Sequence, residues 1–208
     1  MYYEANASHG LAHDPFKAII APRPIGWIST MDNAGVPNLA PYSFFNALSS
    51  SPPMLMFSSE TLKDSARNAR DTGEFVFSLA TETLRHAMNT TSDTVPASQN
   101  EYVNANLVMG KCNLVSVPRV EASPASMECV TLSCNELKDQ HGKPVDTFLV
   151  IGQVVGIHIN DDYINNGRFD TAAANPLARC GYRDYASVSE VFEIMRPTDA
   201  EAYDGIDR

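Results

Sequence analysis

Residues 22–30 read PRPIGWIST, and residues 38–46, one short turn later, read NLAPYSFFN. Residues 32–35 between them read DNAG, a turn sequence, so we expect paired strands over residues 17–31 and 36–46. These strands combine one Arg and the chain's single Trp with a series of hydroxyl and amide side chains. Polar groups on a buried strand pair need hydrogen-bond partners. A flat ligand with a ring, carbonyls and a phosphate would supply them.

The rest of the chain alternates short strands with short helices. We predict strands at residues 52–58, 74–80, 125–137 and 147–159, and helices from Thr61 to Gly73, from Thr81 to about Thr91 and near residues 99–107. No Gly-x-Gly-x-x-Gly follows a strand, and parallel strand–helix alternation is absent, so no nicotinamide-binding Rossmann domain is predicted. The pattern favours a mostly β fold with peripheral helices, in which a closed barrel carries the helices outside.

Composition sets the broad class of the protein. A chain of 208 residues, 44% of them hydrophobic, can bury one core, which predicts a single domain over residues 1–208 with an acidic C-terminal tail. The net charge of -10, with Lys and Arg scattered singly, disfavours nucleic acid as a partner. The sequence lacks a long apolar run and the basic start of a signal peptide, so we expect a cytoplasmic protein that does not engage a membrane. The four cysteines and five histidines have no metal-like spacing, which predicts free or buried thiols and no metal site.

Residues 58–65 combine a strand end, a helix start and several hydroxyl groups, which together make a candidate anion site. Lys63 is the informative residue, because a cation in the first helical turn opposes the helix dipole unless an anion binds there. The alternative is that Ser59 or Thr61 caps the helix while Lys63 is simply solvated.

Other polar residues of the strand pair also have two interpretations. The planar guanidinium of Arg23, between two prolines, suits a phosphate or carboxylate, or else a salt bridge at a surface or interface. Trp27 either contacts a flavin-like ring or belongs to the core. Asn38, Ser43 and Asn46 are suited to hydrogen-bonding a planar ligand.

Several of these segments, taken in order, resemble a known family. They are Pro22 to Thr30, Asn38 to Asn46, Pro52 to Ser58, Lys63-Asp64-Ser65 with Asn68, and Gly73-Glu74-Phe75. Over about residues 15–185 the chain resembles flavin reductase-like proteins with the FMN-binding split-barrel fold, in the branch described as flavoprotein oxygenase or flavin reductase.

The resemblance implies a homodimer with FMN held near the subunit interface. It places one group of residues around the flavin ring and ribityl chain: Ser29, Thr30, Asn38, Ala40 and Ser43, with Asn46 close by. It places a second group at the phosphate end: Ser58, Lys63, Asp64 and Ser65, with Arg23 and Trp27 nearby. Arg179 and Tyr185 are candidates from the C-terminal region.

The resemblance implies an FMN-dependent oxidoreductase that passes electrons from NAD(P)H through bound FMN to a second small acceptor. A nicotinamide that lies transiently on the exposed flavin face needs no Rossmann domain. Hydride transfer to a flavin needs no acid or base, so no catalytic side chain is assigned. The alternative function is a non-enzymatic FMN-binding electron carrier or redox sensor. A haem-binding split barrel is disfavoured, since no axial His lies near the expected barrel mouth.

Overall fold

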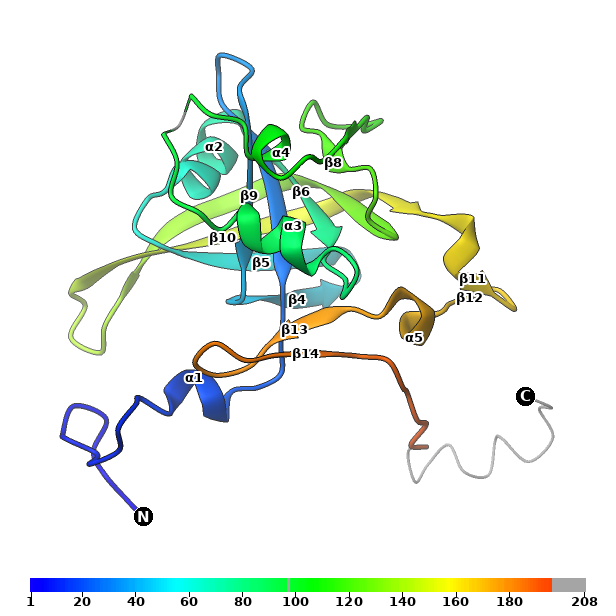
Figure 1. The fold of residues 1–208 in the computed structure, drawn as a ribbon. Helices are drawn as coiled ribbons and strands as arrows, with labels where there is room; N and C mark the ends of the chain where they lie inside the picture. Colours follow the sequence, from blue (N-terminus) through cyan, green and yellow to red (C-terminus); the bar gives the residue numbers. More distant parts are fainter. Residues whose placement is uncertain (97, 196–208) are drawn as a thin grey trace.

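The computed structural model describes residues 1–96 and 98–195, which are built around one large antiparallel sheet (Figure 1). The strand order is β3-β2-β6-β9-β10-β5-β4. The strands are β2 Gly26–Met31, β3 Pro37–Tyr42, β4 Phe45–Ser50, β5 Pro53–Glu60, β6 Glu74–Leu79, β9 Ala125–Lys138 and β10 Pro144–Ile159. The sheet curls so that β3 contacts β5, and the Ser58 N–H donates to the Phe44 carbonyl at 2.8 Å. The predicted mostly β fold with peripheral helices is confirmed.

Smaller elements surround this sheet. β1 Arg23–Pro24 pairs with β13 Leu177–Arg179, which pairs with β14 Tyr185–Ser187, and α1 Phe16–Ile19 lies beside the turn between β13 and β14 (Figure 1). The helices are α2 Asp64–Thr72, α3 Arg85–Thr90, α4 Glu101–Asn104 and α5 Thr171–Ala174, with a 3-10 turn at Asp161–Tyr163. Two further strand pairs are β7 Met109–Gly110 with β8 Arg119–Val120, and β11 Ile164–Asn165 with β12 Arg168–Phe169.

Strand β2 is buried on both faces, which explains its continuous apolar run. Ile28 packs into the barrel core with Phe57 and Phe75, and α2 adds two alanines to that core. On the opposite face, Trp27 packs with Tyr102 in a second core, under α3 and α4. Successive side chains of a strand point to opposite faces. One short strand therefore connects the two cores.

The structure corrects two predicted helix starts. Helix α2 begins at Asp64, and no side chain caps it, because Thr61 lies outside the helix with φ 61° and its N–H donates to the Asp146 carbonyl. Thr81 does not begin a helix either, since it pairs with Pro176 in an isolated β-bridge, and α3 begins at Arg85. In both places a tertiary contact overrides a local capping signal.

One further prediction is wrong, and several others hold. Gly73 ends α2 with φ 77°, as expected for a helix followed by glycine. The strand predicted over residues 17–31 is instead helix α1 followed by β1 and β2. All four cysteines are free thiols, as expected. In the described part of the chain, no helix is both long and apolar enough to cross a membrane. Much of the predicted acidic tail, residues 196–208, lies outside the described residues.

Candidate functional site

Three neighbouring cavities meet at the corner between β3 and β4, and Pro41 lines all of them. The helix-start cavity, of about 280 Å³, is lined by Asn38, Ala40, Lys63, Asp64, Ser65 and Glu101, among others. The corner cavity, of about 170 Å³, includes Ser43, Ser58 and Lys63. We call these two cavities together the β3 groove. The arginine cavity, of about 560 Å³, is lined by residues that include Lys17, Arg23, Arg179 and Arg183.

The N-terminus of α2 opens onto the β3 groove without a capping side chain. Its N-cap residue is Lys63, which is exposed and forms no ion pair within the described residues. Asp64 is paired with Arg67 on the same helix. The first N–H groups of a helix have no partner within the helix, and they attract anions. A cation and uncapped N–H groups at one helix start fit a phosphate.

Asn38 fastens strand β3 to this helix start. Its side-chain amide donates to Ser65 Oγ at 2.8 Å and to Thr30 Oγ1 at 3.2 Å. Tyr42 also lines the groove, and burial raises the pKa of its phenol above the ordinary value. The groove therefore presents neutral polar groups along β3 and one cation, Lys63, at the helix start, where Asp64, Asp93 and Glu101 also line it.

Glu101 is a residue of the groove that the sequence analysis did not identify. Its side chain is 8% exposed, and Oε2 accepts the Leu39 N–H at 3.1 Å. Burial raises the pKa of this carboxyl group. The contact satisfies the backbone on the free side of β3, so Glu101 holds the strand that lines the groove. Acidic residues are common in the first turn of a helix, so the sequence around Glu101 does not indicate a function.

Three predicted site residues point into the protein interior and line none of the three cavities. Trp27 is fully buried and donates from Nε1 to Thr91 Oγ1 at 2.8 Å, in agreement with the core interpretation. Ser29 Oγ lies 2.6 Å from the hydroxyl of Tyr102, and burial raises the pKa of that tyrosine. Thr30 is also fully buried and accepts the hydrogen bond from the Asn38 amide. Their side chains support β3 from behind.

Two other predicted residues do not line the β3 groove. Arg23 is buried and forms no ion pair within the described residues, so the interpretation as a surface salt bridge is wrong. Its guanidinium instead donates to the backbone carbonyls of Lys17, Ile20 and Cys180, which joins α1 to the end of β13. Asn46 is exposed on β4 and lines none of the three cavities.

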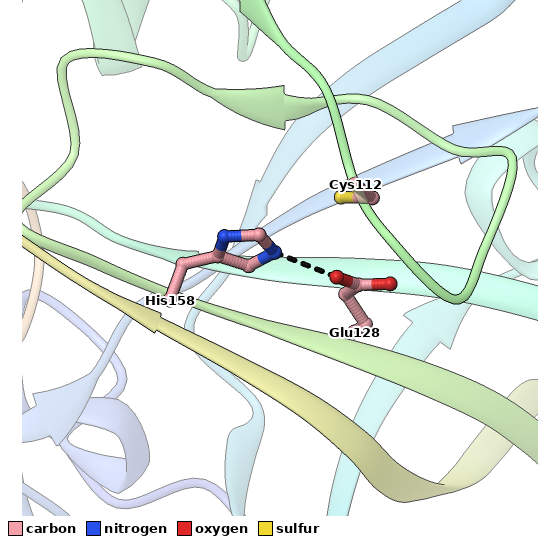
Figure 2. Close-up of side chains that lie close together, drawn as sticks. All are labelled: Cys112, Glu128 and His158. Carbon is pink, nitrogen blue, oxygen red and sulfur yellow. Dashed lines mark hydrogen bonds and ion pairs between the residues drawn. The ribbon is translucent and has the colours of Figure 1, made fainter.

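The sequence analysis also did not identify a cluster of three side chains away from the groove. Figure 2 shows Cys112, Glu128 and His158, whose potential ligand atoms all lie within 4.8 Å of one another. They come from a loop, β9 and β10, so their sequence spacing could not reveal the cluster. His158 Nε2 lies 2.6 Å from Glu128 Oε1, and the N–H groups of residues 113–115 donate to the same carboxylate at 2.6 to 2.9 Å.

These contacts give Glu128 a structural role. Burial would raise the pKa of its carboxyl group, but the hydrogen bonds from the backbone and from His158 more than offset it, so the pKa is lowered. Cys, Glu and His are ligand types that zinc accepts. The Glu128 oxygens already accept four hydrogen bonds, however, which is all that a carboxylate has lone pairs to accept. The carboxylate therefore fastens the loop at residues 112–115 to the sheet.

Comparisons with known proteins identify the family and the fold of the chain. A family model described as a flavin reductase like domain matches residues 20–176, which include β3, the start of α2 and every lining residue of the β3 groove except Lys17. The structure of nitrilotriacetate monooxygenase component B from Bacillus cereus is 30% identical, with a TM-score of 0.83, over 93% of this chain and 99% of that one.

Two solved structures with lower identity share the fold alone. A protein from Shewanella frigidimarina, described as a flavin reductase with a split barrel domain, has a TM-score of 0.77 at 18% identity, over 86% of this chain and 89% of that one. An FMN-binding domain of a flavin reductase-like enzyme from Shewanella baltica has a TM-score of 0.67 at 17% identity, over 83% and 89% of the two chains. The fold is the expected split barrel, and the chain belongs to the flavin reductase like family.

Proposed function

We propose that the protein is an FMN-dependent oxidoreductase that passes electrons from NAD(P)H through FMN to a second small acceptor. The observation that carries this proposal is the β3 groove, in which an uncapped helix start with a free cation lies beside a polar strand, inside the matched region. When bound, FMN supplies the hydride and electron chemistry, and the protein supplies binding and orientation.

The helix-start end of the groove would hold the phosphate. Lys63 supplies a positive charge, Ser58 and Ser65 supply hydroxyl groups, and the first turn of α2 supplies backbone N–H groups. Phosphate binding at a helix N-terminus uses both the free N–H groups and the helix dipole. The Asp64 carboxylate is turned to Arg67, so its charge is partly neutralised beside the anion.

The β3 side of the groove would orient the ring and ribityl chain. Asn38, Ala40 and Ser43 line it, and Asn38 is already oriented by its hydrogen bond to Ser65. Pro41 has no N–H to donate and leaves a flat apolar surface at the corner. Groups that are held in place before the ligand binds lose less entropy when it does.

We also propose that two copies of the chain form a homodimer. The outward faces of the long strands β9 and β10 expose apolar side chains, among them Leu132, 51% exposed, and Ile157, 56% exposed. Beyond β14, Phe192 and Ile194 are more than 80% exposed. Apolar surface of this extent on a folded chain is typical of a protein–protein interface. A second copy is the partner that the family resemblance implies.

Anaerobic reduction tests the proposed activity. Protein loaded with FMN is mixed with NADH or with NADPH, and the visible flavin absorbance is followed. We expect bleaching by at least one nicotinamide, and repeated turnover when an acceptor is added. Bleaching by another redox protein but by neither nicotinamide would overturn the enzyme and favour the electron carrier. Failure to bind FMN would overturn both.

A further inference from the structure

Positive charge is concentrated in the arginine cavity, although the chain as a whole is acidic. Four of the chain's 15 Lys and Arg residues line it, and none of its lining residues is acidic. The whole chain has a net charge of -10. A concave site lined by charge of one sign focuses the electric field and raises the local concentration of ions of opposite sign.

Little of this positive charge is neutralised by the protein. Arg23 is 6% exposed, its terminal nitrogens donate to backbone carbonyls, and its buried Nε has no hydrogen-bond partner. Carbonyl groups orient a guanidinium but leave its full charge in place. Arg183 is exposed and forms no ion pair within residues 1–96 and 98–195. The Lys17 ammonium lies 3.8 Å from the Glu60 carboxylate, an exposed pair that contributes little.

Arg179 is held in position by neutral groups. Its guanidinium lies 4.4 Å from the centre of the Tyr185 ring, and it donates to the Tyr182 carbonyl at 2.5 Å. Both tyrosine rings also line the cavity, together with Met88 and Ile25. The site therefore combines fixed cations with flat apolar walls. Its volume of about 560 Å³ falls in the range of small-molecule sites.

We propose that the arginine cavity binds the anionic group of the small molecule that exchanges electrons with the flavin, so that the protein prefers a negatively charged substrate. The inference rests on the proposed function, because it takes the flavin to lie in the β3 groove. The arginine cavity shares Pro41 and Ser43 with the corner cavity of that groove. A molecule anchored at its anionic end by Arg179 and Arg183 reaches the groove with its other end. A carboxylate and a phosphate both have the required chemistry.

Matched ligands test this proposal. FMN-loaded protein is titrated with benzoate and with its neutral analogue benzamide, and the change in the flavin spectrum gives the dissociation constants. We expect benzoate to bind at least ~10-fold more tightly, and Arg183→Gln and Arg179→Gln to remove most of that preference. Arg70→Gln is the control, because Arg70 is an exposed arginine of α2 that does not line the cavity. Phenyl phosphate distinguishes a phosphate from a carboxylate as the bound group. Tighter binding of phenyl phosphate than of benzoate favours a phosphate-bearing substrate, and weaker binding favours an organic acid.

The outcomes distinguish failure of the anionic-substrate proposal from failure of the proposed FMN-dependent function. Equal affinity for benzoate and benzamide in protein that retains FMN would overturn the anionic-substrate proposal and leave the flavin assignment standing. A benzoate preference that survives both arginine substitutions would overturn it as well. If the wild-type protein does not bind FMN, both proposals fail. Arg183 is exposed, so Arg183→Gln should fold normally, which thermal unfolding checks.

Discussion

Removal of the Lys63 side chain should weaken FMN much more than riboflavin, which lacks the phosphate. Lys63 is the N-cap residue of α2, and no other charged group within the described residues pairs with it. A charge-assisted hydrogen bond contributes about 1.5–3 kcal/mol, equivalent to ~10- to 100-fold in affinity. Because Lys63 is exposed, solvent screens its charge, and we expect Lys63→Ala to weaken FMN by about 10-fold, the lower end of this range.

Fluorescence titration of both flavins measures this effect, with Lys138→Ala as the control, since Lys138 is an exposed lysine at the end of β9. The fold itself should not suffer, because a cation at a helix start is unfavourable by about 0.3–1 kcal/mol. The flavin-free Lys63→Ala protein should therefore unfold at the same temperature as the wild type, or slightly higher. Equal weakening of FMN and riboflavin would refute the phosphate assignment.

Three further predictions follow from the packing. Glu128→Gln should lower the free energy of unfolding by about 1–3 kcal/mol at neutral pH, measured in urea. Because the Glu128 pKa lies below its ordinary value of 4.5, the wild-type advantage is present above 4.5 and should disappear as the pH falls through the lower folded pKa. Gly152→Ala should cost about 1–3 kcal/mol in thermal unfolding, because the added methyl group would overlap the Phe75 ring. Ile157→Glu should convert the proposed dimer to a monomer in light scattering, whereas an unchanged mass would contradict an interface on β10.

Local sequence patterns predicted most of the sheet. Alternating residues and turn sequences are properties of neighbouring residues, and they located β5, β6, β9 and β10 to within a few residues. The starts of α2 and α3 were missed for the opposite reason. The Thr61 N–H donates to the Asp146 carbonyl and Thr81 bridges to Pro176, and contacts between such distant residues leave no local signal.

The residues of the candidate site also differ in whether the sequence could predict their roles. Asn38 and Lys63 lie in segments that were recognisable on their own, and the structure brings those segments to one groove. The role of Glu101 depends on its position under β3, which only the folded chain defines. Arg23 looked like a ligand-binding residue because its side chain is suited to phosphate, yet three backbone carbonyls occupy its guanidinium.

Amide hydrogen exchange, compared with FMN and with riboflavin bound, tests the central claim most directly. The account places the phosphate at the start of α2, so FMN should slow the exchange of the first-turn amides at residues 64–66, and riboflavin should not. Both ligands should protect the β3 segment at residues 38–43 to a similar extent. Protection by FMN at other segments, with residues 64–66 and 38–43 unchanged, would contradict the account.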